Sequence, residues 1–543
     1  MRGVTMRTSV SLLALAACAV GCSRQDAAPV VAPAAQPAAP VAARVAPADA
    51  GIAWVQAASN ADVDAAFARA RAEAKPVFVY WGAKWCPPCN QVKATLFNRQ
   101  DFIERSRAFV PVYVDGDQPG AQKLGTRFSV SGYPTMVLFD SAGQELTRLP
   151  GEVDAQQYTE ALTQGLSARR SVKAVLAQAR SGGQGLDTGD WRLLAYYSWD
   201  TDHDQLVGKA GLAPLLREVA AACPADTPEI AMRLWLKALA AADGKAPVAD
   251  AAARRAPVLA LLADAASARR QMDLLTNDAR ELVHVLSAAK SRERAELVGA
   301  YDAALQRLQA DAALSRADRL GAVIARVQLA RLDEAKGAAP QLPEGLRGEV
   351  RDMAARFDRE IVDGYERQAV IPTAAYALEQ AGLLDESDTL LKANLAKSNS
   401  PYYLMADLAD NAKKRGDKAA ALDWYAQAFD KSEGPATRLQ WGAGYLGALV
   451  ELAPQDGVRI EQVARQLIGE AAALPDAFEA RSGRSMQRIG ARLQAWNKGG
   501  QHTTELRRLQ AQLDSVCARL PATDAGRALC SGVFKPAPKG KTA

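Results

Sequence analysis

Cysteine and histidine are scarce in this chain, which has seven cysteines and three histidines among its 543 residues. Seven cysteines are too few for a fold that depends on a dense set of disulfides. The histidines, His203, His284 and His502, are far in sequence from the closely spaced pair Cys86 and Cys89. A structural zinc site usually needs a second pair of Cys or His ligands, so we predict no metal site.

An excess of charge of one sign is also absent. The chain has 66 basic and 61 acidic residues, which gives a net charge of +5 at pH 7. This balance is too even to indicate a nucleic-acid-binding surface. No glycine-rich phosphate loop follows a predicted strand, and we expect no bound organic cofactor.

Long hydrophobic runs are missing as well. The apolar segment 10–20 is shorter than the about 20 residues that a membrane-spanning helix needs. It follows Arg2 and Arg7, which is the layout of a secretory signal. We therefore expect an exported protein that no helix at this end anchors in the membrane.

The end of this signal resembles the cleavage box of bacterial lipoproteins. Residues 19–22 read Ala-Val-Gly-Cys, and residues 15–18, which end in Cys18, fit the box equally well. We prefer Cys22 as the lipidated residue, because cleavage before Cys18 would leave a very short apolar core. Ser23 favours the outer membrane, so we predict a periplasmic, membrane-anchored lipoprotein. An ordinary cleaved signal is the alternative.

Alanine and proline dominate the segment that follows the signal. We assign residues 1–22 to the signal peptide and residues 23–50 to a disordered tether, because a segment so poor in large apolar side chains cannot bury a core. Residues 536–543 are expected to be a disordered tail. A tether of this kind serves an enzyme or a binding protein equally well.

The most informative sequence present is Cys86-Pro87-Pro88-Cys89, which follows the apolar run 76–81. The run predicts a buried strand. After it, Cys89, Val92 and Leu96 recur with helical spacing. Cys86 should therefore cap a helix, where unsatisfied N–H groups favour the thiolate. We predict that Cys86 is the exposed nucleophile and that Cys89 resolves the mixed disulfide. An inert remnant pair and half of a zinc site are the alternatives.

Further segments continue the pattern of an α/β domain. Helices are expected over residues 61–74 and 154–166, a second buried strand over 109–115, and a hairpin of strands 136–139 and 145–149. This order, together with Trp85 to Cys89 and Gly132-Tyr133-Pro134-Thr135, resembles the thioredoxin superfamily over residues 52–168. The closest resemblance is to the C-terminal domain of bacterial transmembrane thiol:disulfide interchange proteins.

The resemblance implies several features of the site. Pro134 would follow a cis peptide bond, Tyr133 and Pro134 would position the substrate backbone, and Trp85 would shield the cysteine pair. The implied partners are disulfide-bearing periplasmic proteins and an upstream membrane dithiol donor.

The sequence departs from cytoplasmic thioredoxins at two positions. Tyr80 stands where they carry a buried aspartate, and Pro111 stands where they carry the accompanying lysine. Asp115 and Asp117 are candidate proton acceptors, but we predict that they form an ordinary solvated turn. The direction of the exchange is therefore left open.

The larger part of the chain, residues 187–535, has helical periodicity throughout, and we predict an all-α region of helical hairpins. Residues 409–429 resemble a tetratricopeptide repeat, and the same pattern occurs 34 residues earlier, where Gly382 corresponds to Gly416. Generic alanine-rich hairpins are the alternative. A repeat array would offer a concave surface to a protein partner.

Three cysteines fall in this helical part. Cys517 and Cys530 flank a helix break at Pro521, and we predict a structural disulfide between them. Cys223 is expected to be a buried free thiol.

Two functions remain after these exclusions. The first is an exported thiol:disulfide oxidoreductase of thioredoxin fold whose helical region selects or holds its substrate. The second is a lipoprotein scaffold in which the helical array binds a partner and the thioredoxin-like domain is accessory.

Overall fold

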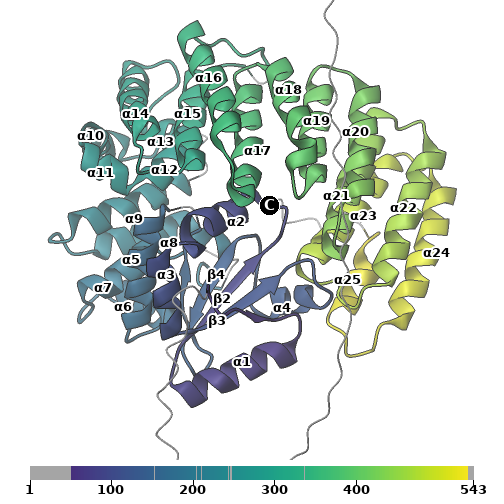
Figure 1. Ribbon diagram of the computed structural model, residues 1–543, viewed down its shortest axis with the longest axis horizontal. Helices are drawn as coiled ribbons and strands as arrows, with labels where there is room; N and C mark the ends of the chain where they lie inside the picture. The colour runs from purple at the N-terminus through teal and green to yellow at the C-terminus, as the bar shows by residue number, and fades with distance from the viewer. Residues whose placement is uncertain are drawn as a thin grey trace, which may run out of the picture. The chain divides into compact units, whose positions relative to one another are not determined.

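The computed structural model describes residues 51–151, 153–202, 205–208, 211–242, 244, 247–335 and 337–535 (Figure 1). The predicted signal peptide, Cys18, Cys22, the tether and the tail lie outside the described residues. None of the helices in the described ranges is both long and apolar enough to span a bilayer.

A five-stranded sheet lies at the centre of residues 51–168. Strand β2 has all six residues buried, and its β-branched and aromatic side chains suit a central strand. It pairs in parallel with β3 and antiparallel with β4, and the strand order is β1-β3-β2-β4-β5. The strands are β1 Val55–Gln56, β2 Val77–Gly82, β3 Val110–Asp115, β4 Thr135–Phe139 and β5 Glu145–Leu149.

Helices cover this sheet on both faces, over two separate apolar cores. They are α1 Asn60–Glu73, α2 Pro87–Val92 with its π-helical continuation η1 Lys93–Phe97, α3 Gln100–Arg105, η2 Ser106–Ala108, α4 Ala121–Arg127 and α5 Ala155–Ser167. The predicted strands and the two long helices are present within a few residues of their expected limits. The short elements β1, α3 and α4 were not predicted. This domain has the thioredoxin fold that the sequence indicated.

The rest of the described chain is helical and contains no strand. Its elements are α6 Val172–Arg180, α7 Thr188–Ala195, η3 Trp199–Thr201, α8 Leu212–Ala222, α9 Pro228–Ala240, α10 Ala251–Ala263, α11 Ala265–Arg270, α12 Met272–Asn277, α13 Ala279–Leu286, α14 Arg292–Ala310, α15 Arg316–Ala330, α16 Glu344–Glu360, α17 Gly364–Gln380, α18 Leu384–Asn394, η4 Leu395–Lys397, α19 Pro401–Lys414, α20 Lys418–Lys431, α21 Pro435–Leu452, α22 Gly457–Ala472, α23 Ala480–Trp496, α24 Thr503–Arg519 and α25 Gly526–Gly532. Helices begin at Val172 rather than near residue 187, because α6 buries the apolar face of Val172, Val175, Leu176 and Ala179.

The predicted 34-residue spacing holds for two helical hairpins. Helices α18 and α20 begin 34 residues apart, and Gly382 and Gly416 precede them in the left-handed region of φ. The next hairpin breaks the spacing, because α21 has 18 residues where α19 has 14. The repeat is therefore local, and most of the region consists of helical hairpins of unequal length.

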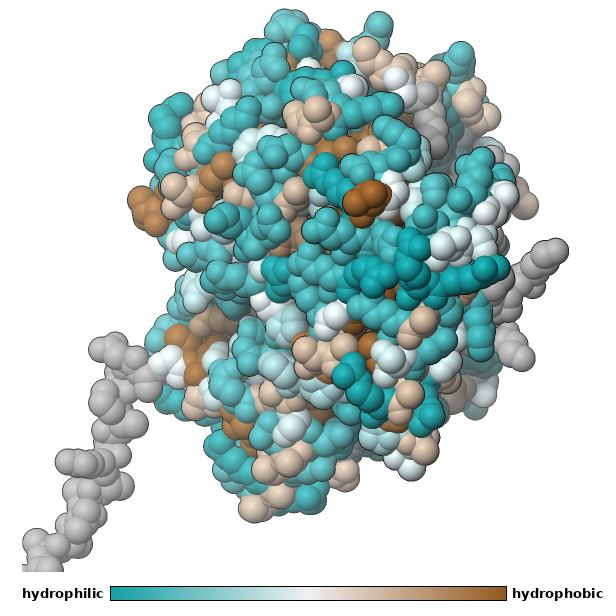
Figure 2. All heavy atoms as spheres, turned by 90° about the vertical axis from the view of Figure 1, so that its right-hand side faces the viewer, coloured by the Kyte–Doolittle hydropathy of each residue, from teal (hydrophilic) through white to brown (hydrophobic). Residues whose placement is uncertain are grey.

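Several helices of the helical region contact the α/β domain. Helix α6 contacts β5, and α23 contacts α4. Helix α17 contacts α2 (Figure 1). We expected the inner side of the helices to receive a separate protein, but in this structure the chain's own thioredoxin-like domain occupies it. The outer face of the C-terminal helices is mostly hydrophilic (Figure 2).

The cysteines of the helical region differ in state. Cys517, in α24, and Cys530, in α25, form the predicted disulfide. Cys223 is a free thiol, half-buried rather than buried, and its burial raises its pKa.

Candidate active site

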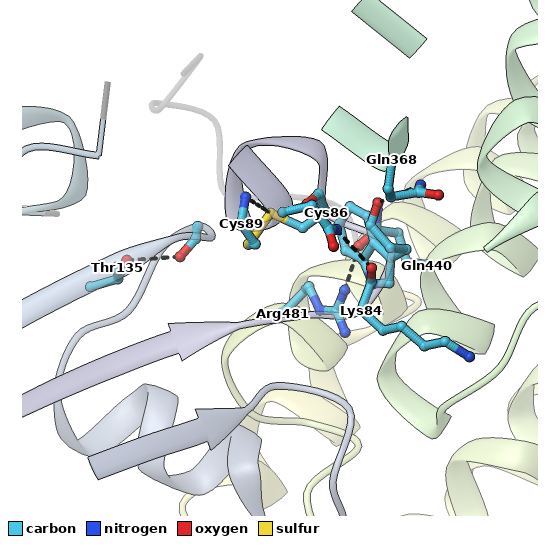
Figure 3. Close-up of a disulfide and its surroundings, with 10 residues drawn as sticks. Lys84, Cys86, Cys89, Thr135, Gln368, Gln440 and Arg481 are labelled. Carbon is cyan, nitrogen blue, oxygen red and sulfur yellow. Dashed lines mark hydrogen bonds between the residues drawn. A yellow bond between two sulfur atoms is a disulfide. The ribbon is translucent and has the colours of Figure 1, made fainter. Parts of the chain in front are cut away.

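The cysteine pair lies where β2 gives way to α2. Cys86 is the N-cap residue of α2, and Pro87 and Pro88 occupy the first helical positions, where no backbone N–H is needed. Cys86 and Cys89 form a disulfide with their Cα atoms 5.2 Å apart, and the Cys89 N–H donates to Cys86 Sγ at 3.2 Å (Figure 3). The structure therefore represents the oxidised state.

A buried amide fixes the loop that carries the pair. Asn90 Nδ2 donates to the carbonyl oxygens of Lys84 and Cys86, at 2.8 Å each. Asn90 was not predicted as a site residue. Its position four residues after Cys86, on a helix that must bury one face, is the signal that could have indicated it.

The second predicted motif lies against the cysteines. The Tyr133–Pro134 peptide bond is cis, as the resemblance implied. Tyr133 and Trp85 pack against Cys86 and Cys89. The Tyr133 hydroxyl accepts a hydrogen bond from Gln122 Nε2 at 3.1 Å. Gly116 makes room for this ring, because a Cβ atom at residue 116 would clash with the hydroxyl.

The cysteine pair is covered, and the prediction that Cys86 is exposed is wrong. The exposed fractions of Cys86 and Cys89 are 2% and 0%. Trp85 and Tyr133 pack on the pair, and the helical region packs on Trp85 in turn, which local sequence around residue 86 cannot reveal. Trp441 of α21 makes an edge contact with Trp85, with ring centroids 5.0 Å apart. Tyr403 of α19 stacks on Trp85 at 6.1 Å. Trp85 thus lies between the disulfide and these helices.

A polar contact adds to this cover. Gln368 of α17 donates its side-chain N–H to the Trp85 carbonyl oxygen at 3.2 Å (Figure 3). Gln368 is itself buried. The backbone of Trp85 is therefore held by a residue 283 positions later in the chain.

Asp117 joins the sheet domain to two distant helices. Its Oδ1 accepts from Thr437 N at 3.0 Å, from Thr437 Oγ1 at 2.6 Å and from Arg481 Nη2 at 2.5 Å. The side chains of Asp117 and Arg481 are 11% and 9% exposed. The prediction of a solvated turn is therefore wrong for Asp117, since its partners come from α21 and α23.

Arg481 also faces the aromatic residues of the site. Its guanidinium lies 5.3 Å from the centroid of the Trp85 ring and 5.1 Å from that of Tyr133. Gln440 accepts a hydrogen bond from Arg481 at 3.1 Å (Figure 3). A cation over both rings stabilises their positions beside the disulfide.

A cluster of titratable side chains surrounds Tyr80, the residue in place of the buried aspartate. The Tyr80 ring stacks on Tyr113 at 5.3 Å, and the Lys93 ammonium lies 5.6 Å from the Tyr113 ring centroid. Burial raises the pKa of Tyr80 and of Asp115, and it lowers the pKa of Lys93. Asp115 is half-buried, so the predicted solvated turn is also wrong for this residue.

A cavity of about 370 Å³ opens beside the cis-proline loop. Pro88, Tyr133 and Pro134 line it from the thioredoxin-like domain. Ser198, Asp200 and Lys237 line it from the helical region. The part of the chain that the structure describes brings together no group of three or more potential metal ligands.

Part of this chain is similar to known proteins. Residues 63–166 match the family described as thioredoxin-like domain. The thiol:disulfide interchange protein DsbD 1 of Pseudomonas aeruginosa is 30% identical over 113 residues, which are 20% of this chain and 19% of that protein. The thiol:disulfide interchange protein DsbD of Yersinia pestis is 33% identical over 98 residues, which are 17% of this chain and 16% of that protein.

A solved structure also aligns with the chain. A thioredoxin from Thermus thermophilus has 28% sequence identity and a TM-score of 0.19, over 21% of this chain and 87% of its own. The chain spans about a fifth of the length of the curated relatives that it matches. Residues 63–166 are therefore a thioredoxin-like domain that is similar to part of the thiol:disulfide interchange proteins, and a large all-helical region follows it.

Proposed function

We propose that this protein is an exported thiol:disulfide oxidoreductase that reduces or isomerises disulfides of periplasmic proteins through Cys86 and Cys89. One observation carries the proposal. The two cysteines form a disulfide at the start of a helix, beside cis-Pro134, in a domain similar to part of the thiol:disulfide interchange proteins.

In the reducing direction, the reaction is a two-step exchange. The Cys86 thiolate attacks one sulfur of a client disulfide, which forms a Cys86–client disulfide and releases the other client sulfur as a thiolate. The Cys89 thiolate then attacks Cys86 Sγ, which forms the Cys86–Cys89 disulfide and releases the second client thiolate. Two electrons pass to the client, whose thiolates take up the protons that the enzyme's thiols gave up.

The remaining site residues position the client, and the dithiol must be regenerated. Tyr133 and Pro134 offer backbone groups to an extended client segment, and Trp85 shields the pair from water. An upstream membrane dithiol donor reduces the Cys86–Cys89 disulfide by the same exchange. Lipidation at Cys22, which the lipoprotein-like sequence of residues 19–22 supports, would anchor the protein, and Ser23 favours the outer membrane.

Trapping of the mixed disulfide tests the proposal. In Cys89→Ala the second step cannot occur, so adducts between Cys86 and client proteins should accumulate and disappear when a reductant is added. Non-reducing gel electrophoresis followed by mass spectrometry detects them, with the double variant Cys86→Ala/Cys89→Ala as the matched control. Equal adduct levels in the single and double variants would contradict the proposal.

The reduction potential of the pair tests the direction. A value near the thioredoxin end of the range, about −270 mV, supports a reductase. A value near the DsbA end, about −120 mV, would instead assign an oxidase.

The lipoprotein scaffold is a second candidate, and the burial of the disulfide beneath the helical region favours it. If the protein is a scaffold, cells with both cysteines replaced should behave as cells with the wild-type protein do. If it is an oxidoreductase, they should behave as cells that lack the protein.

A further inference from the structure

Three arginines follow one face of α23 beside the cis-proline loop. Arg481, Arg484 and Arg488 recur at intervals of three and four residues, so their side chains lie on the same side of the helix. The opposite side of α23 is buried through Met486, Ile489 and Leu493. The arginines therefore point away from the apolar core of the C-terminal helices.

Arg484 is hydrogen-bonded to the loop that would position a client. Its Nη2 donates to the Ser131 carbonyl oxygen at 2.8 Å. Ser131 and Tyr133 both line the 370 Å³ cavity. An extended segment that pairs with the backbone at Tyr133 would therefore pass close to the Arg484 guanidinium.

The positive charge of this face is only partly balanced. Arg481 forms an ion pair with Asp117. In the described part of the chain no carboxylate lies within 4.0 Å of Arg484 or Arg488, whose side chains donate instead to Ser131 and to Ser485 Oγ. Burial and the positive charges of Arg488 and Arg481 lower the pKa of Arg484. An anion placed here would relieve this repulsion.

The cavity itself does not supply the missing negative charge. Asp200, Lys237 and Asp273 line its helical side, and the Asp273 carboxylate is already paired with Arg233 at 2.6 Å. The excess of positive charge beside the cis-proline loop therefore comes from α23.

We propose that the clients of the dithiol bind through an extended segment that carries acidic residues next to its cysteine, and that Arg484 and Arg488 select this charge. The inference rests on the proposed function and names its substrate class. The thioredoxin-like domain supplies the chemistry and the backbone contacts at Tyr133. The helical region supplies the charge preference.

The test uses two synthetic peptides, each with one intramolecular disulfide, that differ only in Glu or Gln at the two positions beside a cysteine. Reduced full-length protein should reduce the Glu peptide about 10-fold faster at low salt, and the ratio should fall as salt rises. In Arg484→Gln/Arg488→Gln the ratio should fall close to one. The single variant Arg488→Gln should lower it partly, and it provides a test at an exposed residue if the double variant unfolds.

The matched control removes two arginines elsewhere. Arg292 of α14 and Arg359 of α16 are exposed. Arg292→Gln/Arg359→Gln changes the net charge by the same amount, and it should leave the peptide ratio unchanged. A ratio near one for the wild-type protein, or an unchanged ratio in the α23 double variant, would overturn the inference. In either case, reduction of both peptides would still support the proposed function.

A measurement of peptide binding distinguishes the charge preference from the proposed function. Fluorescence anisotropy uses peptides in which serine replaces cysteine, so that no disulfide exchange occurs. The Glu peptide should bind the wild-type protein about 10-fold more tightly than it binds the α23 double variant. Failure of electron transfer to either peptide would overturn the proposed function, and the binding result would still decide the charge preference. In another outcome, the α23 double variant loses binding to phosphatidylglycerol vesicles while it binds both peptides as the wild-type protein does. That result would assign the arginines to a membrane surface and overturn the inference.

Discussion

Tyr80 and Asp115 define the electrostatics behind the cysteine pair. In the structure the position of the buried aspartate holds a phenol whose pKa is raised by burial, so it stays neutral at physiological pH. Asp115 is the last residue of the neighbouring strand β3, and burial raises the pKa of its carboxyl group. The charged form of Asp115 is therefore penalised in the folded protein.

Asp115→Asn should stabilise the protein at neutral pH by about 1 kcal/mol, because it removes this penalty. The pKa of Asp115 is higher in the folded than in the unfolded protein. The wild-type protein therefore loses stability as the pH rises through the folded pKa and this carboxyl group ionises. The advantage of the variant should therefore shrink as the pH is lowered, and it should vanish near pH 4 and below. Urea unfolding from pH 4 to pH 8 measures this.

Asp62 provides a control of opposite sign. Hydrogen bonds from the backbone of Ala58 and the side chain of Ser59 lower its pKa, so Asp62→Asn should lose stability at neutral pH. A pH-independent effect of Asp115→Asn would contradict the account of its burial.

Local motifs predicted the residues of the site whose roles are set by their neighbours in sequence. Cys86 at a helix start, the Cys89 pairing and cis-Pro134 follow from such motifs. The partners of Asp117 could not be predicted, because Thr437 and Arg481 lie 320 and 364 positions later. The exposure of Cys86 was predicted wrongly for the same reason.

At the scale of single elements, the helical hairpins depend on tight turns between their helices. Gly416 has φ of +81°, and a Cβ atom there would meet no other atom within 4 Å. The requirement for glycine is therefore conformational, since only the left-handed backbone disfavours a side chain. Gly382 has φ of +75°, so the same conformational requirement made the 34-residue pattern visible in the sequence.

Gly416→Ala should destabilise the protein by about 1 kcal/mol, because alanine is strained at positive φ. Gly444 is the matched control, since it is exposed within α21 and has open space around it. Gly444→Ala should stabilise by up to about 1 kcal/mol through helix propensity. Thermal unfolding compares both variants, and changes of the same sign would refute the assigned turn.

At the scale of the whole described unit, the helical region limits access to the redox centre. Trp441, Tyr403 and Gln368 contact Trp85, and Asp117 and Arg481 fix α23 beside it. An attacking sulfur must reach Cys86, whose exposed fraction is 2%. Exchange with a client therefore requires the contacts of Trp85 with Trp441, Tyr403 and Gln368 to open.

Trp441→Ala should speed the reduction of the Cys86–Cys89 disulfide by a small phosphine reductant by about 10-fold, because truncating an interface aromatic weakens the closed state by more than 1 kcal/mol. Quenching with a thiol-specific probe at timed intervals measures the rate. Trp235→Ala is the control, since Trp235 packs under Arg254, with its guanidinium 3.3 Å from the ring centroid, within the helical region. An equal increase in both variants would indicate general loosening and count against the cover.

The ion pair between Asp117 and Arg481 has a consequence for the order of assembly. A ribosome completes Asp117 long before it completes α23, and chains generally fold from their N-terminal domains onward. The cover over the redox centre cannot be finished until α23 has been made. A nascent or truncated chain that ends before residue 481 would therefore carry a dithiol that is more reactive than the one in the finished protein.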